Sequence, residues 1–332
     1  GGVGRGVGLV ARRGEGEWAG EPVVAQARSR LGAEPLKKLY DAVVAPIAEK
    51  RTKGAWYRQW RLVSLDGSTL DVADTAENEK AFGRPGASRG SSAFPKLRFV
   101  ALLENGTHVL WNAHMDKYAT DELTLAEQVI PALGKGMLCL ADRFFPSYKL
   151  WRMAARTGAD LLWRTRQNAR LDVEKRLPDG SYLSRIYAST SDRRNRRNGI
   201  VVRVIDYQLK DVKDAEPIYR LITSILDHEQ APAKELAALY HERWEIETAL
   251  DELKTQLRGA QIVLRSKTPE LVRQEFFALL MAHFAIRGLM HEAALKADED
   301  PDQLSFLHSV RVVQRRMARY GAIPPSAEES PT

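Results

Sequence analysis

The stretch YHERWEIETALDELK, residues 240–254, presents two different faces if it is helical. An α-helix advances about 100° per residue, so Tyr240, Arg243, Glu247 and Lys254 fall in one narrow stripe. The neighbouring stripe is apolar and would dock on a core; it consists of Leu239, Ile246, Leu250, Leu253 and Leu257. The polar stripe is either the incidental outer face of a surface helix or a functional set, in which a carboxylate is flanked by cations and a phenol.

The chain before this helix alternates between strand-like and helix-like segments. Two short helices are expected in 23–50, broken around 32–35. Strands are expected from residue 56, where 60–74 alternates around a turn at 66–68, and in a hairpin centred on Asn105-Gly106. A helix with Thr120 as N-cap, the apolar strand MLCLAD (137–142), a helix at 146–158 and the strand DLLWRT (160–165) follow.

The remaining pattern completes an α/β chain with a β-rich interruption. Short β-like runs between 163 and 225 are separated by turn residues, and helical patterns then cover 232–258, 269–296 and 301–319. This order predicts a mixed sheet with flanking helices, interrupted by an all-β insertion. The expected division is an N-terminal tail and helical segment (1–55), a first core part (56–162), the insertion (163–228), a second core part (229–320) and a disordered tail (321–332).

Three carboxylates occupy positions where such a sheet binds ligands. Asp66 ends the first predicted strand, Asp142 ends the MLCLAD strand, and Glu247 lies on the opening helix. Each has a simpler explanation: Asp66 as a turn residue before glycine, Asp142 as a helix cap, and Glu247 as a surface charge. Four rival carboxylates are close in sequence, namely Asp71, Asp74, Asp160 and Asp251.

Converging carboxylates repel one another unless a cation intervenes, and oxygen-only ligands suit Mg²⁺ or Mn²⁺. Two such ions would activate the attacking oxygen and stabilise the leaving 3′ oxygen of a phosphodiester. Arg243 and Lys254 would then hold phosphates, and Tyr240 would hydrogen-bond a phosphate or stack on a base.

The basic charge is concentrated in one window. The chain has a net charge of +7 and a pI of about 9.4. Residues 163–203 alone contain 11 Lys or Arg against 4 Asp or Glu. This window begins near Arg164 and is densest in one cluster, Arg193, Arg194, Arg196 and Arg197. Arginine clusters of this kind suit phosphate oxygens, although a solvated loop explains a basic run equally well.

Several classes of protein are disfavoured. The sequence has no apolar run of 18 residues and no secretory leader, so neither a membrane span nor export is expected. The single cysteine, Cys139, lies in an apolar run and is expected to be a buried structural residue. A single unpaired cysteine is compatible with the reducing cytoplasm, which is the expected location. The chain does not begin with Met, and its N-terminal region is expected to be truncated.

At this point the sequence resembles the DDE transposases of bacterial insertion sequences, of the insertion-sequence-four type. The Tyr-Arg-Glu-Lys signature of that group matches Tyr240, Arg243, Glu247 and Lys254. The first acidic motif of the family matches LDGSTLDVADT at Asp66, and the second matches LADRFFPSYKLW at Asp142, with Phe144 where glycine is usual. The similarity covers residues 25–318.

The resemblance implies a ribonuclease-H-like catalytic core, akin to that of retroviral integrases, with Asp66, Asp142 and Glu247 as catalytic residues and metal ligands. It implies two Mg²⁺ ions, replaceable by Mn²⁺, and hydrolysis at transposon ends followed by attack of the 3′-OH on target DNA, usually by cut-and-paste. The implied partners are double-stranded DNA, both the terminal inverted repeats and the target, and a second copy of the chain. The expected setting is a nucleoid-associated cytoplasmic protein.

Two alternatives to an active transposase stay open on the sequence alone. A catalytically defective or domesticated remnant would keep the fold and the basic surface but would only bind DNA. A nuclease of the same fold would cut DNA without transferring strands.

Overall fold

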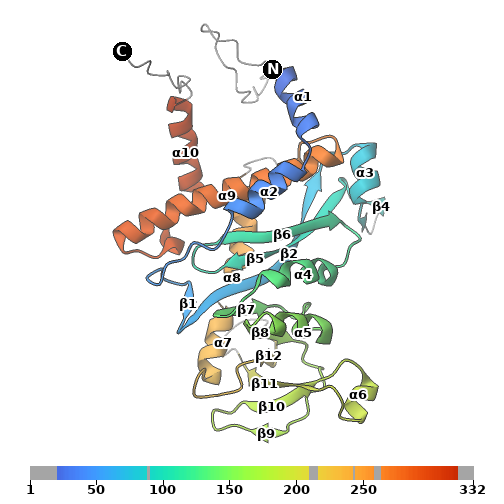
Figure 1. Ribbon diagram of the computed structural model, residues 1–332, viewed down its shortest axis with the longest axis vertical. Coiled ribbons are helices and arrows are strands. Elements are labelled where there is room, and N and C mark those ends of the chain that lie inside the picture. Colours follow the sequence, from blue (N-terminus) through green and yellow to red (C-terminus); the bar gives the residue numbers. More distant parts are fainter. Residues whose placement is uncertain (1–20, 88–89, 209–215, 242–243, 258–262, 321–332) are drawn as a thin grey trace.

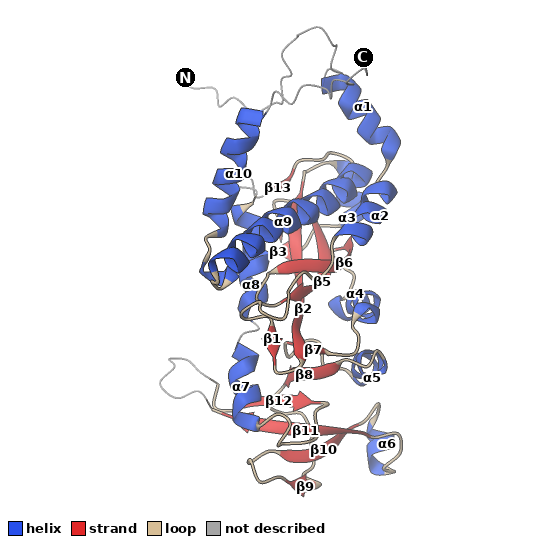
Figure 2. Ribbon diagram, turned by 60° about the vertical axis from the view of Figure 1, so that its left-hand side comes forward, coloured by secondary structure: helices blue, strands red, loops and turns tan. Residues whose placement is uncertain are grey.

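The structure is a computed structural model that describes residues 21–87, 90–208, 216–241, 244–257 and 263–320. A long mixed sheet runs through the molecule, and helices cover both of its faces (Figures 1 and 2). In Figure 2, α7, α8 and α9 lie to one side of the sheet and α4 and α5 to the other. The fold is therefore the layered α/β arrangement that the sequence predicts.

The first half of the chain builds the helical entry and the centre of the sheet. Its elements are α1 (Glu21–Leu31), α2 (Glu34–Val43), β1 (Trp56–Tyr57), β2 (Trp60–Val72), α3 (Ala76–Phe82), β3 (Gly86–Ala87), β4 (Gly90–Ser91), β5 (Lys96–Glu104), β6 (Val109–Lys117), α4 (Glu122–Val129), the 3-10 turn η1 (Ile130–Ala132), β7 (Met137–Ala141), α5 (Tyr148–Arg156) and β8 (Asp160–Thr165).

The second half adds the insertion and the helices that close over the sheet. Its elements are β9 (Lys175–Arg176), β10 (Tyr182–Ile186), α6 (Thr190–Arg194), β11 (Ile200–Tyr207), β12 (Tyr219–Thr223), α7 (Ala233–His241), α8 (Trp244–Asp251), the π-helical turn η2 (Glu252–Gln256), β13 (Val263–Leu264), α9 (Pro269–Ala297), the 3-10 turn η3 (Pro301–Gln303) and α10 (Phe306–Tyr320).

Strand order places β2 and β7 at the centre of the sheet. The order is β6-β5-β2-β7-β8-β12-β11-β10-β9. The pairs β6–β5 and β5–β2 are antiparallel, whereas β2–β7 and β7–β8 are parallel. The insertion does not form a sheet of its own, because β12 pairs with β8 and so continues the central sheet. The predicted insertion is confirmed as β-rich, with the short helix α6 as its one helical element among the described residues.

The predicted turn at 66–68 is wrong. β2 continues without interruption from Trp60 to Val72, so Asp66 lies in the middle of the strand and does not end it. Gly67 serves close packing and not a turn: a Cβ atom there would come within 3.1–3.2 Å of the side chains of Glu122 and Val100. Glycine in a strand often marks such a close approach.

Three smaller expectations are refined. Asp121, and not Thr120, caps α4 by accepting a hydrogen bond from the Leu123 N–H. The β5–β6 hairpin is confirmed, but its connection spans four residues, 105–108, because Glu104 pairs with Val109. The helical pattern expected over 301–319 is divided into the 3-10 turn η3, which Asp300 caps, and α10.

The helical segment around residues 240–254 packs as its apolar stripe predicts. Ile246, Leu250 and Leu253 are buried in the main core, and Leu239 joins a second core between α7 and the sheet. The predicted helix is resolved into α7, α8 and the π-helical turn η2, with residues 242–243 and 258 outside the described part.

A buried ion pair fixes the start of α7 to the insertion. The Arg203 guanidinium of β11 is inaccessible to solvent and donates to Asp179 at 2.6 Å and to the Ala231 carbonyl at 2.7 Å. Asp179 also accepts the Ala233 N–H, at 2.8 Å, in the first turn of α7. The insertion therefore supports the helical segment as well as extending the sheet.

Cys139 on β7 is fully buried, and burial raises the pKa of its thiol to about 12. The expected structural role of this cysteine is confirmed. None of the helices in the described part of the chain is long and apolar enough to cross a membrane.

Candidate active site

Strand register brings the two predicted aspartates side by side. Leu65 of β2 pairs with Ala141 of β7 in parallel register. The residues that follow them, Asp66 and Asp142, are therefore neighbours on adjacent segments of the same chain. Side chains at matching positions of parallel strands project to the same face of a sheet. Because the strands lie about 4.8 Å apart, this register alone places two carboxylates within reach of a shared ligand.

The same row continues to a third strand. Ala141 pairs with Trp163 of β8, so the residue after Trp163, Arg164, is the neighbour of Asp142. Residues two positions earlier in this row, Leu140 and Leu162, pack with α7. Asp66, Asp142 and Arg164 thus extend along the face of the sheet that α7 and α8 cover.

The two aspartates are fixed locally by backbone donors. One carboxylate oxygen of Asp66 accepts the Gly67 N–H at 2.7 Å, and one oxygen of Asp142 accepts the Phe144 N–H at 2.8 Å. The sequence alternative for Asp142, a cap of the next helix, is not realised, because Ser147 caps α5.

Two contacts dock the helical segment on either side of these aspartates. The Tyr240 hydroxyl of α7 donates to the Ala141 carbonyl at 3.2 Å, directly before Asp142. The Lys254 ammonium of η2 donates to the Ser68 hydroxyl at 3.0 Å, two residues after Asp66 on the same face of β2. Glu247 lies between these contacts along the segment, on α8, with an exposed side chain.

The four signature residues differ in what they can offer to DNA. Tyr240 is only 6% exposed, so its ring is part of the core between α7 and the sheet. Glu247 is exposed, and Lys254 is half-buried. Arg243 lies outside the described residues. DNA contacts by these side chains remain predictions.

The three carboxylates do not yet form a compact ligand set. Among the described His, Cys, Asp and Glu residues, one group has potential ligand atoms all within 4.8 Å of one another: His108, Glu245 and Asp302. Asp66, Asp142 and Glu247 do not meet this criterion as a group of three.

Glu216 joins two arginines beside Asp142 through ion pairs. The Glu216 carboxylate forms ion pairs with Arg164, at 2.6 Å, and with Arg143, the residue after Asp142, at 2.8 Å. The hydrogen bond from Arg164, together with Arg143, lowers the pKa of the Glu216 carboxyl. The Arg164 guanidinium also lies over the Tyr219 ring, 4.6 Å from its centroid. Two guanidinium groups are thus held beside Asp142 by one carboxylate.

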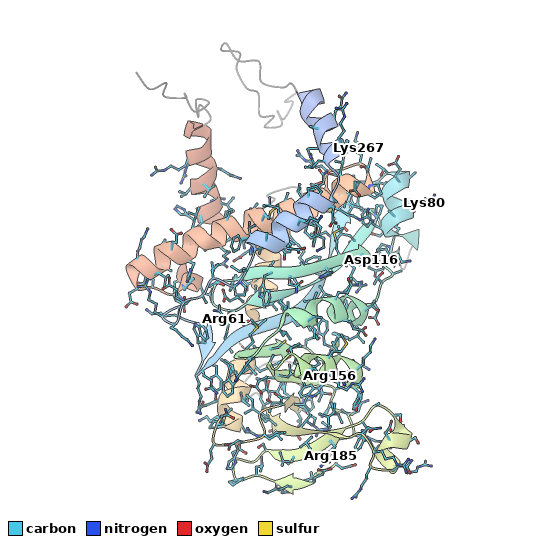
Figure 3. All side chains as sticks on the ribbon, viewed as in Figure 1. Arg61, Lys80, Asp116, Arg156, Arg185 and Lys267 are labelled. Carbon is cyan, nitrogen blue, oxygen red and sulfur yellow. The ribbon has the colours of Figure 1, made fainter. Side chains whose placement is uncertain are left out.

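The predicted arginine cluster is on the surface of the insertion. Arg194, Arg196 and Arg197 are exposed in and after α6, while Arg193 is partly buried near the Tyr187 ring. Figure 3 shows another basic side chain of this part, Arg185 on β10, at the same end of the molecule. The cluster is therefore solvent-accessible.

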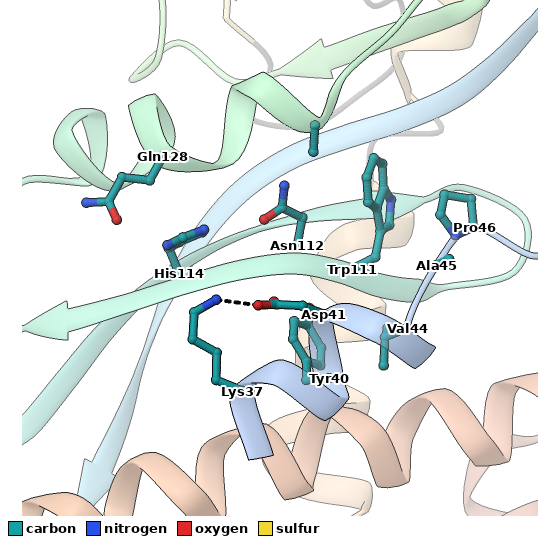
Figure 4. A pocket seen from close by; sticks show the side chains of 11 residues that line it. Lys37, Tyr40, Asp41, Val44, Ala45, Pro46, Trp111, Asn112, His114 and Gln128 are labelled. Atoms are coloured by element: carbon teal, nitrogen blue, oxygen red, sulfur yellow. Dashed lines mark hydrogen bonds and ion pairs between the residues drawn. The ribbon is translucent and has the colours of Figure 1, made fainter. Parts of the chain in front are cut away.

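A separate pocket of about 490 Å³ lies between α2, β6 and α4 (Figure 4). Its charged groups are the Lys37–Asp41 ion pair and His114, whose pKa is lowered by burial and by the charge of Lys37. The pocket opens beside the edge strand β6, two strands away from Asp66. Since Asp41 is the one carboxylate among its lining residues, this pocket offers no acidic cluster.

Arg143 and Glu216 were not among the site residues predicted from the sequence. Arg143 could have been found, because it directly follows a candidate ligand. Glu216 lies 74 residues beyond Asp142 in sequence, and only the pairing of β12 with β8 brings it close.

The strand order and the parallel register place Asp66 and Asp142 side by side on one face of a mixed sheet. Comparison with known proteins gives the family. Residues 59–285 match the model of the transposase DDE domain. The chain belongs to the DDE transposase family and is a DNA transposase of the insertion-sequence-four type.

Two relatives from Escherichia coli strain K12 support this assignment. The chain is 30% identical over 309 residues to the transposase InsG of insertion sequence element IS4, covering 91% of this chain and 68% of InsG. It is 30% identical over 142 residues to the putative transposase InsZ, covering 42% of this chain and 47% of InsZ.

A solved structure supports the fold. The piggyBac transposase, in a synaptic complex with hairpin DNA, superposes with a TM-score of 0.50 at 12% identity, covering 93% of this chain and 63% of that one. The predicted ribonuclease-H-like fold class is confirmed.

Membership of the family implies a divalent metal ion. The residues present fit a divalent metal ion in their chemistry. Asp66, Asp142 and Glu247 offer only oxygen donors, and the basic side chains of Lys254 and Arg164 lie on either side of the aspartates.

Proposed function

We propose that Asp66, Asp142 and Glu247 are the catalytic carboxylates of this transposase and that together they bind two Mg²⁺ ions, for which Mn²⁺ can substitute. The observation that carries the proposal is the parallel register that makes Asp66 and Asp142 neighbours. The Tyr240 and Lys254 contacts add support, since they hold the helical segment that bears Glu247 across the same face.

When bound, two such ions would activate the attacking oxygen and stabilise the leaving oxygen of a phosphodiester. The contribution of the chain is to fix the carboxylates and to neutralise the phosphates. Lys254 and Arg164 flank the row of acids, and each would hold a phosphate oxygen of the DNA end. Tyr240 would act mainly by anchoring α7 beside Asp142, and Arg243 would complete the phosphate contacts.

The proposed substrate is double-stranded DNA carrying the terminal inverted repeats of the element, followed by target DNA. Cleavage at the ends and transfer of the 3′-OH would proceed by cut-and-paste. The exposed cluster Arg193, Arg194, Arg196 and Arg197 supports DNA binding along the insertion. Two copies of the chain would bridge two ends, in a nucleoid-associated complex in the cytoplasm.

The test is strand transfer. The chain is incubated with a labelled duplex ending in the 3′-OH of the element and with a supercoiled plasmid, in Mg²⁺ or in Ca²⁺. We expect labelled plasmid with Mg²⁺, none with Ca²⁺, and complexes of two chains and two ends by mass photometry. End-specific binding without any joining in Mg²⁺ or Mn²⁺ would contradict an active enzyme and favour the DNA-binding remnant.

A further inference from the structure

A second group of potential ligands lies at the start of α8. His108 belongs to the β5–β6 connection, Glu245 to the first turn of α8 and Asp302 to η3. Their potential ligand atoms all lie within 4.8 Å of one another. The group differs chemically from Asp66, Asp142 and Glu247, together called the acidic row, because it includes an imidazole nitrogen. Three elements far apart in sequence meet at this point.

The His108 imidazole is buried and aimed into this group. The residue is 3% exposed, and its Nε2 atom has no hydrogen-bond partner among the described residues. Nε2 nevertheless lies 3.1 Å from Asp302 Oδ1 and 3.9 Å from Glu245 Oε2. A buried polar atom without a hydrogen bond destabilises the fold, so its position needs a cause.

These separations suit ligands that share one ion. Two atoms that each lie 2.0–2.2 Å from a tetrahedral Zn²⁺ are about 3.3–3.6 Å apart. The separations of Nε2 from the two carboxylate oxygens bracket that range. Asp302 has no hydrogen-bond or ion-pair partner other than His108 for its carboxylate among the described residues. Glu245 Oε2 also accepts the Gly106 N–H at 2.6 Å, which fixes this carboxylate beside the imidazole.

The far side of the ring resembles the support of a metal-binding histidine. His108 Nδ1 lies 3.4 Å from Oε1 of Glu252, a buried carboxylate. Arg287 donates to Glu252 Oε2 at 2.9 Å, and His283 contacts the same atom at 3.2 Å. Metal-binding histidines commonly direct their second nitrogen to a carboxylate, which orients the ring.

A competing arrangement needs no ion. The Arg287 guanidinium also contacts His108 Nδ1. If Arg287 donates to Nδ1, the ring proton lies on Nε2 and points toward Asp302. The metal arrangement instead requires a proton on Nδ1, shared with Glu252, and leaves Nε2 free to bind an ion.

We propose that His108, Glu245 and Asp302 form a binding site for one divalent transition-metal ion of the Zn²⁺ type. The imidazole selects against Mg²⁺ and Ca²⁺, which prefer oxygen ligands. The ion would tie α8, the helix that carries Glu247, to the β5–β6 connection and to η3. Its role is structural, and the site does not depend on the proposed catalytic role of the acidic row.

The test is Zn²⁺ binding to the full chain in the absence of DNA. Untagged protein is freed of metal with a chelator and titrated with Zn²⁺ by calorimetry. His108→Asn removes the imidazole, and asparagine tolerates the positive φ of 57° at this position. Asp302→Asn removes one charge with little change in volume. Asp298→Asn, whose side chain is 96% exposed, is the matched surface control, and Glu247→Gln removes a carboxylate from the acidic row.

We expect one Zn²⁺ per chain in the wild type, Asp298→Asn and Glu247→Gln. We expect affinity at least tenfold weaker in His108→Asn and Asp302→Asn, with an unchanged far-ultraviolet circular dichroism spectrum. If His108→Asn does not fold, Asp302→Asn alone decides. Wild-type affinity in either folded variant, or no one-to-one binding in the wild type, would overturn the proposal. Loss of binding only in Glu247→Gln would assign the ion to the acidic row instead.

Discussion

Arg164 is the basic side chain that the sheet places next in register to the aspartates. The register of β7 and β8 makes Arg164 the neighbour of Asp142. Its guanidinium forms an ion pair with Glu216, which also pairs with Arg143. A DNA phosphate offers the same pair of anionic oxygens as a carboxylate and suits two guanidinium groups. The glutamate and an incoming DNA strand would therefore compete for the same arginines.

Glu216→Gln is predicted to tighten DNA binding. Removing this half-buried charge frees both arginines, and because ion pairs near the surface contribute about 0.2–1 kcal/mol, the gain in affinity should be about 1.4-fold to fivefold. Fluorescence anisotropy with an end duplex at fixed salt measures the change. Glu127→Gln on α4 is the matched control, since Glu127 pairs with Lys149 on the opposite face of the sheet. Equal gains in both variants would reduce the effect to net charge.

At the scale of single residues, the sequence predicted which acidic and basic side chains are candidates for the site, but it predicted the local backbone geometry around them less well. The acidic and basic candidates were found from spacing, but Asp66 was placed at a turn because Asp-Gly-Ser is a common turn sequence. Gly67 instead packs closely against the side chains of Val100 and Glu122 on neighbouring elements. Such long-range packing leaves no local signal in the sequence.

Among the elements, α7 depends on a buried ion pair that the sequence did not indicate. Asp179 accepts from Arg203 and from the backbone of α7. Burial raises the pKa of Asp179, but its hydrogen bonds and the Arg203 charge outweigh burial, and the net effect lowers the pKa below its usual value. The ionised carboxylate is thus the form that stabilises the fold.

Asp179→Asn is predicted to lower the free energy of unfolding by about 3 kcal/mol at pH 7, because it leaves a buried guanidinium without its counter-charge. The folded-state pKa of Asp179 is depressed. Its contribution is therefore fully present well above the unfolded-state value, about 3.9, and is lost as pH falls through the folded-state value.

Urea denaturation of the wild type and Asp179→Asn from pH 7 to pH 3 measures this contribution. The difference between them should stay constant down to about pH 5 and shrink below about pH 4. Asp172→Asn, also in the insertion, is the control and should differ little from the wild type, since Asp172 is exposed and outside this ion pair. A difference that grows as pH falls would contradict the assigned ionisation.

Element types were largely predictable because the periodicity of 2 or 3.6 residues is a local property. The hairpin, the β7 and β8 strands and the apolar stripe of α8 follow from it. The π-helical turn η2 did not, since the pattern of Glu252–Gln256 is compatible with an ordinary helix. Its geometry is decided by docking, where Lys254 contacts Ser68 and Glu252 contacts α9.

For the whole molecule, basic side chains gather at two opposite ends. The arginine cluster lies on and beside α6, and a second basic group lies on α10, at the other end of Figure 1. If DNA follows the insertion, the two ends should contribute unequally to the salt dependence of binding. Sequence composition revealed the basic window, but not where it would lie relative to the acidic row.

Replacing Arg193, Arg194, Arg196 and Arg197 with Ala is predicted to reduce the slope of log affinity against log salt, by about 0.9 for each phosphate that the cluster neutralises. Anisotropy titrations at several salt concentrations measure the slope. The control replaces four exposed basic residues of α9 and α10 with Ala, namely Lys296, Arg311, Arg315 and Arg316. A slope changed only by the control set would place the DNA on the other end of the molecule.

The order of strands in the sheet depends on pairing between distant segments, which periodicity does not specify. Resemblance to a family supplied the fold class, and the structure then showed the strand order and the register that joins Asp66, Asp142 and Arg164. We propose that this register and the docked helical segment bring Glu247 toward the two aspartates, on the same face of the sheet.

The most direct measurement is Mg²⁺-dependent nicking of an end duplex by wild type, Glu247→Gln and Asp251→Asn. Asp251 is an exposed carboxylate on the same helix, four residues later, and controls for charge and helix stability. We predict that Glu247→Gln lowers the nicking rate at least a thousandfold with unchanged end binding, whereas Asp251→Asn nicks at nearly the wild-type rate. Retained nicking in Glu247→Gln, or equal loss in both variants, would contradict the account.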